Sequence, residues 1–261
     1  MRRQVGILGA GVMGNAIAER LVPDVSVYIY DHKEIDRRSP ARREGITVIE
    51  SVSELTERAD VLFIAVQPKD LRVVSDSLSP FLRDRHRIVS ILAGTTLDVL
   101  RSHFPETRLF RTMPNLLLTR GKGVFGIVDD PSYDRDERGE MENLLSPLGE
   151  VVRLDEGVMD AFSALTGSGP AFICLIIEAM IDAGISLGLK EHEALHYALR
   201  TVEGTAGFLR EEGTFPETLR RRISSPGGTT IEGLNELEHQ KVRSGIIKCL
   251  RACHQKAKTL R

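Results

Sequence analysis

The chain has 261 residues, with 35 lysines and arginines against 37 aspartates and glutamates, and a formal net charge of −2. This length allows one large domain or two modest ones, each with its own core. The balanced charge, an aromatic content of 5% and the lack of tryptophan argue against nucleic acid as the main partner, because neither a basic surface nor a stacking platform for bases is indicated.

The cysteines are Cys174, Cys249 and Cys253. Their odd number without a spaced framework favours a reducing, cytoplasmic location. Cys249 and Cys253 lie four residues apart in a helical pattern beside His254. A metal site would need more converging ligands, so we expect half-buried helix residues there and no metal.

The first motif follows a strand-like run at Val5 to Leu8 and precedes a helical pattern at 15–21. Residues 9–14 read G-x-G-x-x-G. In such a motif the first glycine permits a tight turn, the second lets the backbone approach a pyrophosphate, and the third allows close packing of helix on strand. We therefore expect a dinucleotide site, with cofactor contacts from Gly9, Gly11, Val12, Met13 and Gly14.

The second predicted strand, 25–30, ends at Asp31. An acidic residue about 20 residues beyond the glycines can accept a hydrogen bond from the ribose 2′-hydroxyl of NAD, and it repels a 2′-phosphate. This favours NADH. NADPH stays an alternative because four basic residues follow closely and could pair with that phosphate, namely His32, Lys33, Arg37 and Arg38.

Further apolar runs at 61–66, 88–92, 109–113, 123–128 and 151–154 alternate with helical patterns, which predicts a parallel sheet with right-handed crossovers. Ligands of such sheets bind beyond the carboxyl ends of the strands. Thr95 and Asp98 there form a capping pattern for a following helix. The cofactor residues predicted at this edge are Val66, Gln67, Pro68, Ala93 and Gly94, and Asn115 is a candidate for the substrate.

From Ala161 onward the pattern is helical, over 170–188, about 191–211, 216–223, 230–237 and about 238–258. Pro170 lies at or near the first position of the first of these helices. The prediction is an α/β chain with a dinucleotide-binding domain at 1–155 and an all-helical domain at 156–261. Residues 171–189 approach membrane-spanning length, but Glu178, Asp182 and late glycines favour a helix buried in the core or in a dimer.

A turn at 225–228 then leads into the helix that begins near Thr229. Thr229 and Glu232 have the spacing of a capping box. The preceding glycines leave backbone N–H groups accessible, and the amino end of a helix attracts an anion. A small carboxylate would fit this turn without any arginine or lysine.

Taken together, these segments resemble the pyrroline-5-carboxylate reductases, the enzymes of the last step of proline synthesis. The resemblance covers nearly the whole chain and is carried by residues 9–14, 65–68, 90–96, 111–115, 165–172 and 225–230. It implies a Rossmann-type domain followed by a helical domain that interlocks with a partner subunit as a homodimer. It also permits a larger ring of dimers.

The resemblance also implies roles at the substrate site. The amides of Gly228, Thr229 and Thr230 would hold the substrate carboxylate, the Thr230 hydroxyl would lie near the ring nitrogen, and Ser225 matches the family serine of this loop. The catalytic candidates are therefore Thr230 and Ser225. The chain departs from the family at Gln67, where many relatives carry lysine, and at 116–118, where Leu-Leu-Leu replaces Thr-Pro.

The reaction implied is hydride transfer from the nicotinamide C4 to the imine carbon of a cyclic imino acid. No His, Asp or Glu stands out as a general acid, and a cyclic imine protonates readily, so positioning is the main requirement. The alternatives are a reductase of a related cyclic imino acid, an enzyme of the β-hydroxyacid dehydrogenase type, and a non-catalytic nucleotide-binding regulator. The second relies on a lysine base, whereas Lys190 here lies at a turn between helices.

Overall fold

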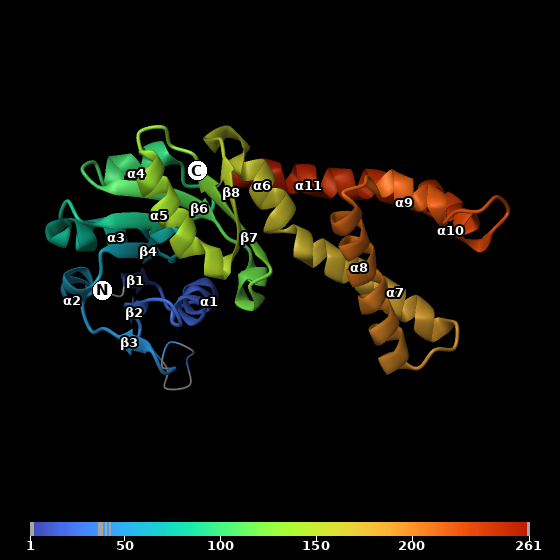
Figure 1. Cartoon of the computed structure of the whole chain (residues 1–261), viewed down its shortest axis with the longest axis horizontal. Coiled ribbons are helices and arrows are strands. Elements are labelled where there is room, and N and C mark those ends of the chain that lie inside the picture. Colours follow the sequence, from blue (N-terminus) through green and yellow to red (C-terminus); the bar gives the residue numbers. More distant parts are fainter. Residues whose placement is uncertain (1–2, 36–38, 40, 42, 260–261) are drawn as a thin grey trace. The chain divides into compact units, whose positions relative to one another are not determined.

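The computed structural model describes residues 3–35, 39, 41 and 43–259 (Figure 1). The chain forms two compact units. The first, here called the sheet unit, comprises Met1–Gly167 with His254–Arg261, and the second, the helical unit, comprises Ser168–Cys253.

The sheet unit is built on a sheet that has eight strands within the described residues, in the order β3-β2-β1-β4-β5-β6-β7-β8. The order turns back between β1 and β4, which is the switch point where dinucleotides bind in open α/β sheets. The strands are β1 Gln4–Leu8, β2 Ser26–Tyr30, β3 Ile46–Val48, β4 Val61–Ile64, β5 Arg87–Ser90, β6 Arg108–Met113, β7 Gly123–Val128 and β8 Gly149–Leu154.

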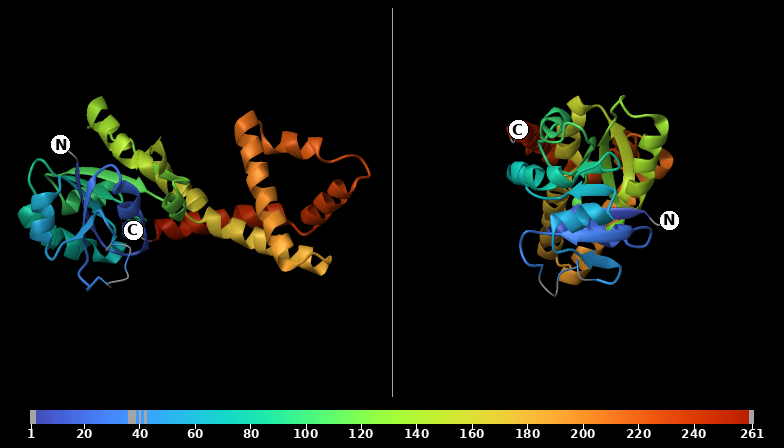
Figure 2. Two further views of the ribbon diagram at one scale, coloured as in Figure 1. Left: turned by 60° about the horizontal axis from the view of Figure 1, so that its bottom comes forward. Right: turned by 90° about the vertical axis from the view of Figure 1, so that its left-hand side faces the viewer.

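Helices cover both faces of this sheet (Figures 1 and 2). Alternate strand residues point to opposite faces, so one sheet supports two apolar layers. One layer includes α1 Val12–Leu21 and α5 Arg135–Leu145. The other includes α2 Val52–Arg58, α3 Leu71–Leu78, α4 Leu97–His103 and α6 Met159–Thr166.

The predicted strands are confirmed, most of them with ends moved by one or two residues, but the sheet is not wholly parallel. β7 pairs antiparallel with β6, whereas β8 is parallel to β7. The link from β6 to β7 holds only a short 3₁₀ segment, Leu116–Arg120, which ends at Gly121 with φ 65°. Such a link lacks the crossover helix that a parallel neighbour needs, so the chain reverses. The strand β3 and the helix α6 were not predicted.

The helical unit matches the predicted helices within a few residues. They are α7 Gly169–Ser186, α8 Glu191–Glu212, α9 Pro216–Arg222, α10 Thr229–His239 and α11 Val242–Lys258. Pro170 occupies the first turn of α7, as predicted. Cys249 and Cys253 are half-buried on α11, also as predicted, and the described residues contain no group of three His, Cys, Asp or Glu that could hold a metal.

The apolar side chains of the helical unit are largely uncovered. In the described part of α7 no residue is buried, and Ala194 and Ala198 are the buried residues of α8. Within the described chain, one stretch, Glu156–Ser186, is long and apolar enough to cross a membrane, with a mean hydropathy of 1.7. One such stretch is weak evidence of a span, because interface and core helices have the same composition.

Candidate cofactor and substrate site

The glycine loop between β1 and α1 is fixed by backbone contacts. Gly9 has φ 107°, and a Cβ there would collide with the carbonyl oxygen of Ala65 at the end of β4. A Cβ at Gly14 would collide with the carbonyl oxygen of Gly9. The first and third glycines of the motif are thus required by the fold itself, because any larger residue would push the loop off the sheet.

Gly11 is different, because the space beside it is open. Among the described residues, no atom beyond its chain neighbours lies within 4 Å of where its Cβ would stand. Gly11 is the N-cap of α1 and is exposed, so the first amides of that helix face this space. An open cradle at a helix amino end, kept free of a side chain, fits a pyrophosphate. Of the next residues, Val12 is 71% exposed and Met13 is half-buried.

Ala10, inside the motif, is held at both of its backbone polar groups. Its N–H donates to Asp31 Oδ2 at 2.8 Å, and its carbonyl accepts from Asn15 Nδ2 at 2.5 Å. Gly9 adds a hydrogen bond from its N–H to the Tyr30 carbonyl at 2.8 Å. Sequence reasoning assigned no role to Asn15. The available signal was an amide side chain directly after the last glycine of the motif.

Asp31 is engaged on its other oxygen as well. Oδ1 accepts from the Lys33 N–H at 3.0 Å and lies 3.1 Å from His32 Nδ1. The Asp31 side chain remains 20% exposed, and a carboxylate has about four acceptor positions, so it can still accept from a ribose hydroxyl. Of the basic residues considered for a 2′-phosphate, Arg37 and Arg38 lie outside the described residues.

The other predicted cofactor residues follow β4 and β5, at the carboxyl edge of the sheet. After β4, Val66 and Pro68 are half-buried and Gln67 is exposed. After β5, Ala93 is half-buried and Gly94 is buried with φ 72°.

The cap of α4 differs from the prediction. Thr96, not Thr95, is extended, and its side chain accepts from the Val99 N–H at 3.3 Å. The expected pair of Thr95 and Asp98 is wrong because Thr95 is buried one residue before the helix can begin.

Asn115 lies at the end of β6 and is 5% exposed. Its Nδ2 donates to the Thr166 carbonyl at 3.0 Å, which ties the strand end to the last residue of α6. Its Oδ1 is buried and has no hydrogen-bond partner among the described residues. Next to it, Leu116 and Leu117 are 53% and 44% exposed, while Leu118 is fully buried and anchors the 3₁₀ segment.

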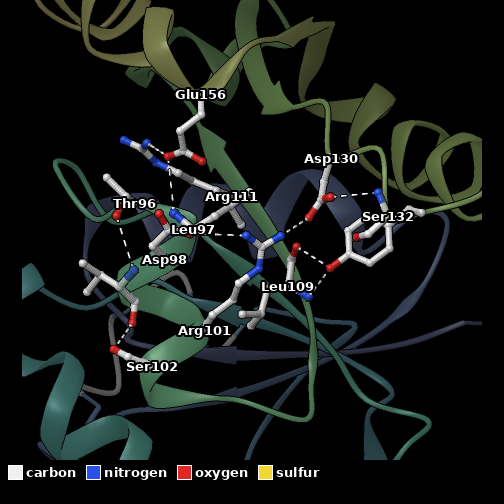
Figure 3. A network of polar contacts seen from close by, with 12 residues as sticks. Thr96, Leu97, Asp98, Arg101, Ser102, Leu109, Arg111, Asp130, Ser132 and Glu156 are labelled. Atoms are coloured by element: carbon white, nitrogen blue, oxygen red, sulfur yellow. Dashed lines mark hydrogen bonds and ion pairs between the residues drawn. The ribbon is translucent and has the colours of Figure 1, made fainter.

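A buried arginine near this edge was missed by the sequence reasoning. Arg111 on β6 is among the largest fully buried side chains, and its guanidinium binds Glu156 (Figure 3). The guanidinium also stands 3.7 Å from Asp160. A single charge in an otherwise apolar strand was the available signal. Its partners lie 45 and 49 residues further along, in a segment without a recognisable pattern.

In the helical unit the 225–230 turn has the expected form but a different cap. Gly227 has φ 68°, and the Gly228 N–H donates to the Ser225 carbonyl at 3.1 Å. Gly228 is the extended N-cap of α10, so Thr229 and Thr230 are its first two residues. The capping box of Thr229 with Glu232 is therefore wrong: in the described structure no side chain caps this helix. Ser225, Thr229 and Thr230 are exposed and Gly228 is half-buried.

Two family models match the chain. Residues 156–260 match the model described as pyrroline-5-carboxylate reductase dimerisation, and residues 4–94 match the NADP oxidoreductase, coenzyme F420-dependent, model. The chain is similar in fold to the Plasmodium falciparum pyrroline carboxylate reductase solved with NADP bound, with a TM-score of 0.89 and 24% identity over 99% of this chain and 98% of that one.

Two curated relatives extend the likeness to the sequence. The pyrroline-5-carboxylate reductase of Aquifex aeolicus is 36% identical over 98% of this chain and 97% of its own length. That of a Synechocystis strain is also 36% identical, over 100% and 99% respectively. Because this identity spans both the glycine loop and the helical unit, the chain belongs to the pyrroline-5-carboxylate reductase family.

Proposed function

We propose that the protein reduces 1-pyrroline-5-carboxylate to L-proline with a reduced nicotinamide dinucleotide. The observation that carries the proposal is the open cradle at Gly11 in a chain whose 36%-identical relatives bear this enzyme's name. When bound, the cofactor supplies the hydride for the imine carbon. The protein binds and orients both partners of that transfer.

The cofactor is held chiefly by the sheet unit. Gly11, Val12 and Met13 offer the first amides of α1 to the pyrophosphate, and the fixed turns at Gly9 and Gly14 keep that helix end in place. Asp31 accepts from the adenosine ribose. The nicotinamide side of the site is formed by residues beyond β4 and β5, namely Val66, Gln67, Pro68, Ala93 and Gly94.

The substrate carboxylate binds the amides of Gly228, Thr229 and Thr230. This is supported by the uncapped first turn of α10, whose amides receive no side-chain hydrogen bond within the described structure. The Thr230 hydroxyl holds the ring nitrogen, Ser225 supports the turn, and Asn115 contributes from the end of β6. Orientation is the main task of these groups, because the imine needs no strong acid to become electrophilic.

NADH is the preferred cofactor, because the Asp31 carboxylate repels a 2′-phosphate. Asp31→Asn keeps an oxygen for the Ala10 N–H while removing the charge. We expect this variant to shift the ratio of kcat/KM towards NADPH, whereas Asp31→Ala lowers kcat/KM with both cofactors because the loop loses its hold on Ala10. An Asp31→Asn enzyme with an unchanged ratio would contradict the preference.

The active assembly is a homodimer formed through the helical domain. We place this domain at 156–261, after a cofactor domain at 1–155. The dimers can associate further into a larger ring. We place the enzyme in the cytoplasm, with neither nucleic acid nor membrane as a partner. The apolar α7 is proposed to lie against the partner subunit instead, which accounts for its exposed side chains.

The test is the loss of absorbance of NADH, and separately of NADPH, on adding 1-pyrroline-5-carboxylate to the purified protein. Turnover that yields proline supports the proposal, and Thr230→Ala should lower kcat/KM modestly without abolishing it. A wild-type kcat/KM in Thr230→Ala would remove that residue's role. Cofactor binding without turnover would point to a related cyclic imino acid, to a β-hydroxyacid substrate or to a regulator. The imino acid is tested in the same assay, and the β-hydroxyacid by the gain of absorbance when it is added with NAD+ or NADP+.

A further inference from the structure

Arg111 carries a charge into an apolar layer of the sheet unit. Its strand neighbours on the same face, Leu109 and Met113, belong to the buried cluster that also contains Leu97 and Met159. The Arg111 side chain itself is 0% exposed. A guanidinium in such a place must be matched by opposite charge.

Two carboxylates supply that match: Glu156 comes from the 3₁₀ turn just before α6, and Asp160 from the first turn of α6. Arg111 Nη1 donates to Glu156 Oε1, and Nη2 stands 3.7 Å from Asp160 Oδ1. The side chain of Asp160 is 5% exposed and that of Glu156 is 35% exposed. Arg111, Glu156 and Asp160 are here called the buried ion cluster, and Figure 3 shows its pair of Arg111 and Glu156.

The buried ion cluster also reaches α4. Glu156 Oε1 accepts from the N–H of Leu97, the first residue of that helix, at 3.3 Å. Leu97 follows the turn at 93–96, which comes directly after β5. Through Asp160 the charge on β6 therefore holds the start of α6, and through Glu156 it holds the end of the turn where Ala93 and Gly94 lie.

Stability alone does not account for this arrangement. Burying charges costs several kcal/mol per ion, and apolar replacements of buried ion clusters are often neutral or stabilising. In the described structure Arg111 Nε has no hydrogen-bond partner, so the desolvation of this guanidinium is not fully offset. The buried ion cluster costs folding free energy but fixes three elements at one edge of the sheet. Such a cluster is suited to positioning that edge for a ligand.

The edge it fixes corresponds to one half of a dinucleotide site. The adenosine side lies by β1 and β2, where the glycine loop and Asp31 are found, and the nicotinamide side lies across the switch point by β4, β5 and β6. We propose that Arg111 is a positioning residue that, through Glu156 and Asp160, sets the turn at 93–96 for the nicotinamide half of the cofactor. This inference rests on the proposed function.

The test compares two probes that differ in the nicotinamide. ADP-ribose reports on the adenosine and pyrophosphate side alone, and NADH reports on both sides. Because the chain has no tryptophan, calorimetry is the suitable binding measurement. The wild type should bind NADH more tightly than ADP-ribose, and the ratio of the two Kd values measures what the nicotinamide half adds.

Three variants separate positioning from folding. Arg111→Met leaves two carboxylates without their cation and can fail to fold. The triple variant Arg111→Met, Glu156→Gln, Asp160→Asn removes all three charges and keeps an oxygen for the Leu97 N–H. Arg101→Met is the matched control. Arg101 lies on the same helix α4, is half-exposed and stands away from Glu156 (Figure 3). The substitution removes its ion pair with Asp130, which has a distance of 2.6 Å.

We expect the folded triple variant to bind ADP-ribose as the wild type does. Its preference for NADH over ADP-ribose, measured as the ratio of the two Kd values, should fall about tenfold or more, and so should its kcat, because small misplacements at a reacting centre are costly. Arg101→Met should keep the wild-type preference for NADH and the wild-type kcat. A folded triple variant with the wild-type Kd ratio and kcat would overturn the proposal, as would equal loss of both probes. A wild type that binds neither NADH nor NADPH would instead refute the proposed function.

Discussion

At the scale of single residues, the three glycines of the cofactor loop are required for different reasons. Gly9 and Gly14 are glycines because backbone atoms of the protein occupy the space where a Cβ would be. Gly11 faces no such atom among the described residues, so nothing in the fold demands a glycine there. In the proposed function the demand comes from the cofactor, and Gly11 is then the position where folding and cofactor binding can be separated.

Gly11→Ala should therefore leave the thermal unfolding midpoint close to that of the wild type and raise the Kd for NADH, by about tenfold if the added methyl costs about 1.4 kcal/mol of binding. Gly14→Ala should lower the midpoint itself, because its Cβ meets the Gly9 carbonyl. Calorimetry of binding and of unfolding on the same samples tests both. A Gly11→Ala protein that binds NADH normally would contradict a pyrophosphate over this residue.

A second residue-scale prediction concerns Asp130, whose side chain is 7% exposed. Burial by itself raises the pKa of this carboxyl, but hydrogen bonds from Ser132 and the charge of Arg101 together outweigh burial and hold the pKa below its usual value. A lowered folded pKa contributes stability above the unfolded pKa, and this contribution is lost as pH falls through the folded value.

Acid unfolding should accordingly be less steep in Asp130→Asn than in the wild type below about pH 4, where unfolded aspartate begins to bind protons. At neutral pH the variant should be less stable, because Arg101 loses the charge of its partner. Denaturant unfolding at a series of pH values measures the difference. Parallel curves for the two proteins over the acid range would show that Asp130 contributes nothing to the pH dependence.

At the scale of elements, helix starts show what a sequence pattern leaves open. Two hydroxyl residues are adjacent at 95–96 and again at 229–230, and either member can begin a helix by composition. The backbone conformation determines which residue is the N-cap. Before α4 it is Thr96, which is extended at φ −76°, ψ 163°, and before α10 it is Gly228. The N-cap is the residue with the extended backbone, and the course of the preceding turn determines which residue that is.

Thr96→Ala should lower the free energy of unfolding by about 1 kcal/mol, the usual cost of a lost N-cap. Ser102→Ala in the same helix is the matched control. The Ser102 hydroxyl is exposed and bonds the Val99 carbonyl from inside the helix, so its removal should change stability little. Chemical denaturation with a shared m-value compares the two, and equal effects would contradict the cap at Thr96.

Other elements could be predicted only where local pattern determines them. The glycine loop, most strands and the long helices were predicted because their residues show period and punctuation directly. β3 has three residues, too few for a period, and the direction of β7 depends on the compact turn at Leu118 and Gly121. The buried ion cluster was not predicted, because its members meet only after β6, the start of α4 and the start of α6 pack together.

At the scale of the whole molecule, the two units differ in how they bury apolar side chains. The sheet unit closes two apolar layers of its own. The helical unit leaves many large apolar residues uncovered, among them Ile173 at 46% and Leu175 at 66% exposure on α7. Helices of this composition are covered in soluble proteins by another chain, which agrees with the dimerisation model matched by residues 156–260.

If a second copy covers α7, the stability of the helical unit must depend on protein concentration, since dissociation precedes or accompanies its unfolding. Leu175→Glu should convert the dimer to a monomer in sedimentation and lower the unfolding midpoint, while ADP-ribose still binds the sheet unit. Arg58→Gln, which removes an exposed ion pair on α2 and a cation–π contact with Tyr28 in the sheet unit, should keep the dimer. A Leu175→Glu protein that stays dimeric would show that this part of α7 lies outside the interface. A midpoint independent of concentration in the wild type would show that the helical unit folds without its partner.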